Sequence, residues 1–351
     1  MRKICYLTGT RAEFGLMKKI LQGIEADKKL ELILLATGMH LLKEFGNTIN
    51  EVKVEFPQVK IIDATYEEDN RLSMARFVGR AFSQLVEALA EAKPDLVLVL
   101  GDRGEQLAMA IASAYLAIPV IHLHGGEQTA TIDNKARNAI SQLSDWHLAA
   151  SHSAAKKLRQ MGIDKQRIKI VGAPGLDQIK NLPLALKKDC LIVLQHPDEK
   201  EEDAAWQIQQ TLEAVVEFKL PVKVIYPNSD AGGRKMIAVI EEVKQQYPQL
   251  IETFPSIERL KFLQLLNRAR VLIGNSSSGL IEAPAFNLPA VNIGPRQKGR
   301  EQAKNVVNVD YNRKQISRAV SKSLGWRFNR LKNPYGDGQT SQRVIKFLKR
   351  L

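Results

Sequence analysis

Short apolar runs alternate with longer amphipathic segments along the whole chain, and this alternation limits the possible folds more than any other feature. The runs are bounded by turn residues and are apolar at successive positions, which is typical of strands buried on both faces of a parallel sheet. Repeated strand and helix segments predict parallel sheets covered by helices on both faces. We therefore expect an α/β fold.

The alternation divides into two series of similar length. The first predicts strands at 4–7, 32–36, 96–100, 120–123, 147–149 and 168–171, with helices near 12–27, 70–92, 104–117, 134–143 and 153–161. The second predicts strands at 191–194, 222–226, 250–254, 271–273, 290–293 and 306–309, with helices near 203–218, 233–247, 257–269, 278–286 and 312–325. Turn formers cluster between the series. We expect two doubly wound, Rossmann-like domains facing a cleft (1–174 and 175–330) and a final helical segment (331–351).

Composition narrows the class of protein. Hydrophobic residues make up 44% of the 351-residue chain and charged residues 25%, as in ordinary globular proteins, which excludes a disordered or collagen-like chain. Cys5 and Cys190 each lie in an apolar run, so we expect buried thiols in a reducing compartment. The apolar runs are shorter than the ~18 residues that a membrane helix needs. The N-terminal run is too short for a signal peptide. We expect a cytoplasmic protein that does not enter the membrane.

Positive charge gathers at the C-terminal end. Residues 296–351 hold 15 Lys and Arg against 3 Asp and Glu, within a chain of net charge +13. Such a segment suits nucleic acid or acidic lipid. Its aromatic residues, however, are not interleaved with the basic ones as a stacking platform requires. We favour the interpretation that this segment forms a solvated helical face and supplies a few arginines for an anionic substrate. We expect no nucleic-acid partner.

Ligands of open α/β sheets bind beyond the carboxyl ends of the strands, so the residues that follow each strand are the candidates for chemistry. The first strand leads into a glycine turn and Arg11, which suits an anion at a helix N-terminus but also fits a plain strand–helix turn. Asp102 and Arg103 follow the strand at 96–100. Asp102 suits either a catalytic carboxylate or a helix N-cap, and this segment alone favours the N-cap.

Histidines and acids follow the strand at 120–123. His122 and His124 share one face of it, and Glu127 comes after two glycines. Three interpretations stay open: acid–base catalysis, buried hydrogen-bonded histidines, and a zinc site, which ranks lowest because a third ligand is not evident. Asp133 then opens a helix, as an N-cap or as a catalytic carboxylate.

The second half supplies groups suited to a diphosphate. His196 follows the strand at 191–194, and Asn228 lies in a polar, glycine-rich turn. The segment 274–279, with Ser276, Ser277 and Gly279, combines hydroxyls and glycines at a helix N-terminus and predicts a phosphate cradle. Arg296 adds charge. These groups predict a nucleotide sugar bridging the cleft.

Taken together, the strings GTRAEFGL, GDRGE, HLHGGE, GAPGLD, QHP, YPNSDAGG, GNSSSGLIEAP and VNIGPRQKGRE resemble those of the hydrolysing UDP-N-acetylglucosamine 2-epimerases of sialic acid biosynthesis. The strings lie in order over residues 9–301. The resemblance implies a glycosyltransferase-B type fold whose last helix crosses back to the first domain. It also implies conversion of UDP-N-acetylglucosamine and water to N-acetylmannosamine and UDP, through elimination to a glycal and then hydration. It implies no metal or redox cofactor, and a homodimer or homotetramer.

The resemblance also implies residue roles. Asp102 and Asp133 match positions that move protons, and His196 matches a histidine near the diphosphate. The positions that match UDP contacts are Arg11, Arg103, Asn228, Ser276, Ser277, Glu282 and Arg296, with Glu282 on the ribose hydroxyls.

This chain departs from the sialic acid enzymes at three positions. His124 stands where they carry a catalytic glutamate, Ala130 where glycine is usual, and Asn138 where histidine is usual. His124 can still serve as a base, and Glu127 can take over. His124 motivates a second hypothesis, the same chemistry on a UDP-linked 2,4-diacetamido-trideoxyhexose. A third is the non-hydrolysing epimerase, whose branch has proline where this chain has Ala12. A fourth is a polyanion-binding protein that uses the basic C-terminal segment.

Overall fold

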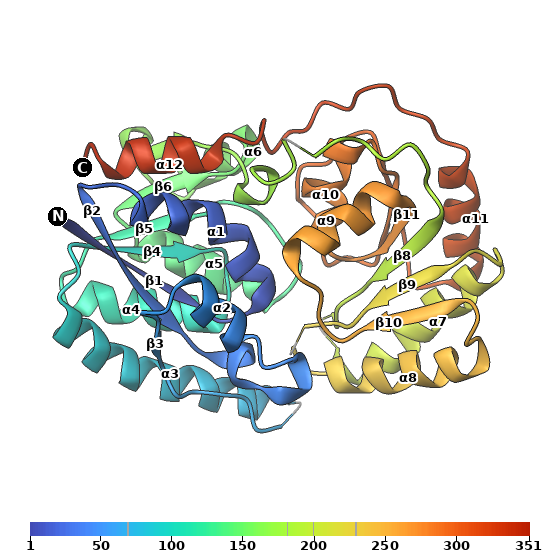
Figure 1. Ribbon diagram of the computed structural model, residues 1–351, viewed down its shortest axis with the longest axis horizontal. Coiled ribbons are helices and arrows are strands. Elements are labelled where there is room, and N and C mark those ends of the chain that lie inside the picture. Colours follow the sequence, from blue (N-terminus) through green and yellow to red (C-terminus); the bar gives the residue numbers. More distant parts are fainter. Residues whose placement is uncertain (69, 181, 199, 229) are drawn as a thin grey trace.

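A computed structural model describes residues 1–68, 70–180, 182–198, 200–228 and 230–351, and these form two parallel sheets side by side (Figure 1). The first sheet has seven strands in the order β3-β2-β1-β4-β5-β6-β7, and the second has six in the order β10-β9-β8-β11-β12-β13. Within the described residues, every pair of neighbouring strands is parallel. The predicted α/β class with two doubly wound sheets is therefore confirmed.

The strands of the first sheet are β1 Arg2–Thr8, β2 Leu30–Ala36, β3 Lys60–Ile61, β4 Leu96–Leu100, β5 Val120–Leu123, β6 Trp146–Ala149 and β7 Ile168–Ile170. Those of the second are β8 Cys190–Leu194, β9 Val222–Ile225, β10 Ile251–Phe254, β11 Ala269–Gly274, β12 Ala290–Ile293 and β13 Val306–Val309.

The helices of the first half are α1 Arg11–Glu25, α2 Ile49–Glu55, α3 Arg71–Ala92, α4 Gly104–Tyr115, α5 Ile132–Leu143 and α6 His152–Gln160. Those that follow are α7 Ala204–Val216, α8 Gly233–Gln246, α9 Arg259–Arg268, α10 Ser278–Ile281, α11 Arg313–Leu324 and α12 Thr340–Leu348. None of the helices in the described ranges is long and apolar enough to cross a membrane.

Each sheet is buried between helices, which explains the continuous apolar runs. The strands β4 and β8 are buried at every position. The apolar faces of α1 and α7 belong to the two separate cores that form against these sheets. Since a strand buried on both faces cannot alternate polar and apolar residues, the runs predicted these strands well.

Three elements differ from the sequence prediction. The short strand β3 and the helix α2 were not predicted, because β3 is two exposed residues long and α2 carries only a short apolar pattern. The predicted helix at 278–286 is instead α10 followed by a separate 3-10 turn, Ala283–Phe286. Pro284 lies in that turn, where its ring prevents a continuous α-helix.

The chain crosses between the halves twice, and the two crossings lie against each other. The first crossing joins β7 to β8, and the second joins α11 to α12 (Figure 1). The Ala173 amide donates to the Tyr335 carbonyl at 2.8 Å, and Gly172 and Gly336, both with positive φ, pack together there.

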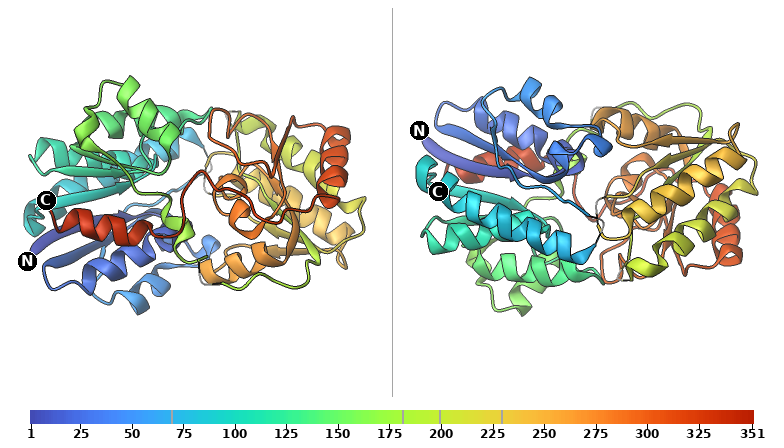
Figure 2. Two further views of the ribbon diagram at one scale, coloured as in Figure 1. Left: turned by 90° about the horizontal axis from the view of Figure 1, so that it is seen from above. Right: turned by 90° about the horizontal axis from the view of Figure 1, so that it is seen from below.

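After the second crossing, α12 lies beside α1 of the first half (Figure 2). Arg2 donates to the Leu348 carbonyl at 2.6 Å, so the two ends of the chain are neighbours. Lys349 forms an ion pair with Asp27 at 2.7 Å. The C-terminal helix is thus packed on the opposite half from the strand and helix that precede it.

Buried histidines make the fold sensitive to acid. Burial lowers the pKa of His40 and of His122 to about 3 and that of His147 to about 4. In the unfolded chain each of these histidines binds a proton near pH 6.5, whereas in the folded chain it stays neutral. The free energy of unfolding is therefore highest above pH 6.5 and falls as the pH drops towards 4. We expect the free energy of unfolding to fall by about 1 kcal/mol per buried histidine between pH 7 and 5.5.

Urea unfolding at the two pH values measures this loss. The variant His122→Asn should show a smaller loss than the wild type, whereas His152→Gln, which alters an exposed histidine, should match the wild type. An equal loss in all three proteins would contradict the assignment to His122.

Candidate active site

A cavity of about 390 Å³ lies between the two halves, at the carboxyl ends of strands from both sheets. It is the place where the order of each sheet reverses, beside β1 and β4 in one half and β8 and β11 in the other. The predicted residues that line it are Arg11, Asp102, Arg103, His124, Asp133, His196, Asn228, Ser276, Ser277, Glu282 and Arg296. The fold therefore brings together side chains from the two halves that lie far apart in the sequence.

The two remaining predicted residues lie behind the wall of this cavity. Glu127 is 5% exposed and contacts His124, which itself lines the cavity. Gly279 is buried in α10, where a Cβ would lie 3.3 Å from Ala290, and its carbonyl accepts from Asn305. Gly279 is thus placed to pack α10 against β12. Ser229 of the glycine-rich turn lies outside the described residues.

Asp102 follows β4 and forms an ion pair with Arg137 of α5. The Arg137 side chain is buried, and its Nη1 also donates to the Glu127 carbonyl at 3.1 Å. Asp102 does not cap α4, because the N-cap residue of that helix is Arg103. The ion pair holds the Asp102 carboxyl group at the edge of the cavity, where it can act as a proton acceptor.

His124 leaves β5 with a φ of +62°, a conformation that a residue with a Cβ rarely adopts. Its Nδ1 lies 3.2 Å from Glu127 Oε1. Arg300, which follows β12, reaches across to Glu127 at 2.8 Å. Although burial raises the pKa of Glu127, Arg300 and His124 outweigh it and bring the pKa to about 2. Glu127 is therefore a carboxylate at neutral pH.

Asp133 lies in the first turn of α5 and faces the second half. Arg296 Nη2 is 3.8 Å from its carboxylate. Burial and the nearby charge of Asp230 raise the pKa of Asp133, and Arg296 opposes them only in part. Asp133 thus favours its protonated form more than an ordinary aspartate does, which suits a proton donor.

His196 follows β8 and is held by its neighbours. Its backbone is bonded to the Asn275 side chain in both directions, with the His196 amide donating at 2.7 Å and its carbonyl accepting at 2.9 Å. Burial, Arg296 and Arg103 hold the pKa of His196 well below its usual range, so the ring is neutral. Nδ1 accepts from the Asn228 amide at 3.1 Å. The ring proton is therefore on Nε2, which can donate to an anion.

The serine turn joins β11 to α10. Gly274 has a φ of +133°, and a Cβ there would collide with the Leu194 carbonyl, so the turn requires glycine. Ser276 Oγ accepts from the Ser278 amide at 3.3 Å. Arg296 Nη1 reaches the Asn275 carbonyl behind the turn at 3.4 Å. Hydroxyl groups and a guanidinium thus line one wall of the cavity.

Two arginines of the first half also line the cavity. Arg103 pairs with the buried Glu105 at 2.6 Å and donates to the Tyr66 hydroxyl at 3.1 Å. Arg11 pairs with Glu51 at 2.6 Å. Arg11 also donates to Ser256 of the second half at 3.0 Å. These acids fix the guanidinium groups in place without a ligand.

Three residues of the site were missed by sequence reasoning. Arg137 and Arg300 pair with Asp102 and Glu127, and Arg259 pairs with Glu282 at 2.8 Å. Arg300 lies inside the string VNIGPRQKGRE, and Arg137 follows Asp133 by about one helical turn of α5, so these basic residues were the available signal. Arg259 has no such signal, because it opens α9 and reaches Glu282 only in the folded chain.

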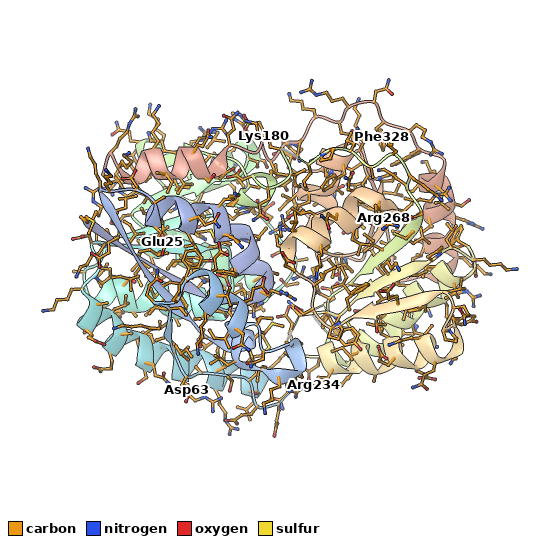
Figure 3. All side chains as sticks on the ribbon, in the orientation of Figure 1. Glu25, Asp63, Lys180, Arg234, Arg268 and Phe328 are labelled. Carbon is orange, nitrogen blue, oxygen red and sulfur yellow. The ribbon has the colours of Figure 1, made fainter. Side chains whose placement is uncertain are left out.

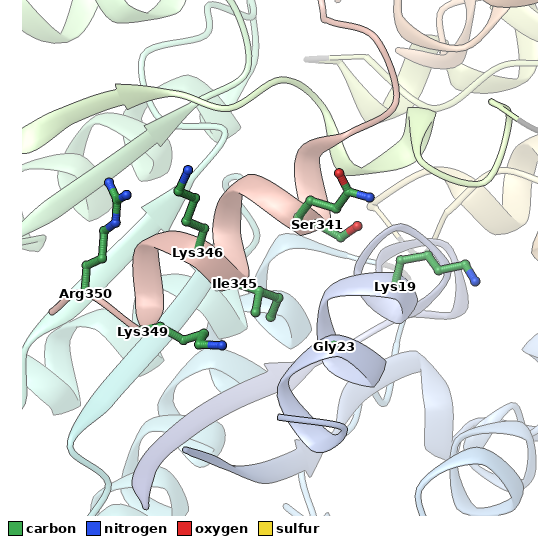
Figure 4. Close-up of a pocket in the computed structure, with 8 residues that line it drawn as sticks. Lys19, Gly23, Ser341, Ile345, Lys346, Lys349 and Arg350 are labelled. Carbon is green, nitrogen blue, oxygen red and sulfur yellow. The ribbon is translucent and has the colours of Figure 1, made fainter. Parts of the chain in front are cut away.

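A second hollow, of about 530 Å³, lies between α1 and α12 on the first half (Figure 4). It is lined by Lys19, Gly23, Ser341, Gln342, Ile345, Lys346, Lys349 and Arg350. None of the predicted site residues lines it. Among the described residues, no group of three or more His, Cys, Asp or Glu is arranged to hold a metal ion.

Comparison with known proteins identifies the family. The model of the UDP-N-acetylglucosamine 2-epimerase family matches residues 22–349. The chain belongs to this family. The prediction made from the sequence strings is therefore confirmed.

Individual members of the 2-epimerase family match over nearly the whole chain. It is 39% identical to a hydrolysing UDP-N,N'-diacetylbacillosamine 2-epimerase of Legionella pneumophila, covering 99% of this chain and 96% of the relative. It is 35% identical to a UDP-N-acetylglucosamine 2-epimerase of Neisseria meningitidis, covering 93% of this chain and 89% of the relative.

A solved 2-epimerase structure has the same fold. The UDP-GlcNAc 2-epimerase of Methanocaldococcus jannaschii, solved in complex with UDP-GlcNAc and UDP, superposes with a TM-score of 0.83 at 19% identity and covers 99% of this chain and 100% of that one. The architecture is thus the glycosyltransferase-B type that the sequence strings implied.

Proposed function

We propose that this 2-epimerase hydrolyses a UDP-linked 2-acetamido sugar and inverts the sugar at C2. The supporting observation is the cleft itself, where a wall of arginines, serines and a neutral histidine faces two aspartates and a second histidine. A pyrophosphate needs the first set of groups and a proton transfer at carbon needs the second. Arg296 links the two sets, because it contacts both the serine turn and Asp133.

The first half-reaction is an elimination. A base takes the proton from C2, the C2–H electron pair becomes the C1=C2 double bond, and the C1–O pair leaves with UDP. Asp102 and His124 are the candidate bases. His196 Nε2–H and Arg296 stabilise the negative charge that develops on the departing phosphate.

The second half-reaction adds water to the glycal. A base takes one proton from water, the oxygen bonds to C1, and an acid protonates C2 from the opposite face. Asp133 is the candidate acid. The products are UDP and the free 2-epimeric sugar, so two proton acceptors and one donor suffice. This is the set that Asp102, His124 and Asp133 provide.

Two substrates are candidates, UDP-N-acetylglucosamine and UDP-N,N'-diacetylbacillosamine. We favour the second. The supporting observations are the 39% identity to the Legionella enzyme and an apolar stretch of the cleft wall beside Arg103, formed by Met39, Tyr66, Met74, Phe77 and Val78. A 2,4-diacetamido-trideoxyhexose carries a methyl group where N-acetylglucosamine has its C6 hydroxymethyl group, and an acetamido group with a further methyl where N-acetylglucosamine has its C4 hydroxyl. Apolar side chains match these methyl groups better than they match hydroxyls.

A substrate panel tests the proposal. We expect both UDP-2-acetamido sugars to release UDP and the free 2-epimeric sugar, with kcat/KM about tenfold higher for the diacetamido substrate. In heavy water, the product should carry deuterium at C2, detected by NMR. UDP-glucose, which lacks the acetamido group, is the control substrate. An intact nucleotide sugar epimerised at C2 would show the non-hydrolysing reaction instead, and no turnover of either substrate would refute the proposal.

A further inference from the structure

We propose that Glu127 and Arg300 are positioning residues that fix the ring of His124 as a proton acceptor, and that Glu127 itself transfers no proton to or from the sugar. The inference rests on the proposed function, because it assigns roles to three residues in that reaction. It also departs from the expectation that Glu127 replaces the missing catalytic glutamate.

The location of Glu127 separates it from the substrate. Its side chain is almost fully buried and does not line the cleft, whereas His124 does. Both carboxylate oxygens are engaged, Oε1 with His124 Nδ1 at 3.2 Å and Oε2 with Arg300 Nη2 at 2.8 Å. A carboxylate held in this way cannot approach a sugar carbon without breaking an ion pair that is buried on both sides.

The ionisation of Glu127 determines the tautomer of His124. A carboxylate only accepts hydrogen bonds, so the Nδ1 that faces it must carry the ring proton. In the neutral ring, Nε2 then holds the free lone pair and is the basic atom. When Nε2 takes a proton in either half-reaction, Glu127 faces the positive charge that forms on the ring, as the aspartate does in a serine protease triad.

The two histidines of the cleft thus have opposite tautomers. His196 carries its proton on Nε2, because its Nδ1 accepts from a backbone amide. His124 carries its proton on Nδ1. His196 can therefore donate a hydrogen bond to the phosphate, and His124 can accept a proton. In each ring the group that faces Nδ1 determines which nitrogen carries the proton.

Arg300 makes this arrangement depend on both halves. It follows β12 of the second half, and its Nη1 donates to Gln297 Oε1 at 3.0 Å. Gln297 in turn donates to the Asn275 carbonyl at 2.7 Å, and the Asn275 side chain holds His196. A continuous polar chain therefore joins His124 in the first half to His196 in the second. Arg300 can therefore pair with Glu127, the partner of His124, only when the two halves are in contact.

The test uses Glu127→Gln, Arg300→Met and the double variant, assayed on the better substrate of the panel. Glutamine keeps the shape of Glu127 but loses its charge, and its amide can turn its nitrogen towards His124. We expect each single variant to lower kcat by about 10- to 100-fold, within the range that general base catalysis supplies. The affinity for UDP, measured by calorimetry, should stay within about twofold, and the double variant should be no slower than the slower single variant.

A matched control is available at the same boundary. Arg234, at the lower edge between the halves in Figure 3, forms an ion pair with Glu44 at 2.7 Å, and neither residue lines the cleft. Arg234→Met should leave kcat unchanged, which shows that loss of an ion pair between the halves is not in itself the cause. Arg300→Lys, which restores the charge, should recover part of the lost rate and serves if Arg300→Met is unstable.

Several outcomes would overturn the inference. They are an unchanged kcat in Glu127→Gln, additive losses in the double variant, and a loss of UDP affinity in Arg300→Met that accounts for the loss of rate. The first would remove any role for Glu127, and the second would show that Glu127 acts independently of Arg300. If the wild-type protein binds UDP but turns over neither UDP-sugar, the proposed function fails instead, so the two failures are distinguishable.

Discussion

The variant Asp102→Asn should lose at least about 10³-fold in turnover while it still binds UDP, because it removes a base and leaves the pyrophosphate wall intact. Asparagine keeps an oxygen that can accept from Arg137, so the buried guanidinium retains a hydrogen bond and the fold should survive. The amide, however, cannot take up a proton. The rate of UDP release under substrate saturation and the dissociation constant of UDP are the two measurements.

Ser277→Ala is the matched control for Asp102→Asn, since it alters the opposite wall of the same cleft. Removal of a hydrogen bond to a charged group costs about 1.5–3 kcal/mol, which corresponds to roughly 10- to 150-fold weaker UDP binding. Turnover at saturation should change much less. Equal losses of UDP affinity in both variants would mean that Asp102 has a structural role and moves no proton.

Asp133→Asn should lose the second half-reaction more than the first, with a drop of about 10²- to 10³-fold in formation of the free sugar. The basis is the raised pKa of Asp133, caused by burial and by Asp230, which marks it as the group that supplies a proton. Without that proton, C2 of the glycal is not protonated and the free sugar does not form. We expect a single turnover to release UDP and accumulate the unsaturated sugar, detected by the vinyl proton in NMR.

Asp133 also gives a pH dependence with a defined sign. Its raised pKa keeps the acid form populated at a higher pH than for an ordinary aspartate, so sugar formation should decline as pH rises through that pKa. Replacement of the neighbouring Asp230 by Asn should remove one cause of the raised pKa and shift this decline to lower pH. If Asp230→Asn instead moved the decline to higher pH, the assignment of Asp133 as proton donor would be wrong.

The sequence predicted the strands of both sheets except β3, because these strands are short, mostly apolar runs followed by turn residues, whereas β3 is two exposed residues. It also predicted the positions of the candidate groups, since side chains such as Asp102 and His196 come directly after those strands. Burial of a group was harder to predict. Glu127 follows two glycines, and neither these nor its other neighbours in the sequence indicate that Arg300 pairs with it in the folded chain, where it is buried.

Pairings between the halves could not be predicted at all. Arg300 and Glu127 are far apart in the sequence, and their contact depends on how the two sheets face each other. The same holds for Arg296 and Asp133. Arg259 and Glu282 lie in the same half, but they are separated in the sequence and pair only in the folded chain.

The paired crossings between the halves have a mechanical consequence. Because the two crossings are bonded to each other at Ala173 and Tyr335, the halves are joined along one seam and not by two separated tethers. Rotation about this seam would lengthen neither crossing, whereas sliding of one half past the other would pull the two crossings apart and break the hydrogen bond between them. A Cβ on Gly336 would lie 3.2 Å from the Gly172 Cα, so the close approach of the two crossings depends on these glycines.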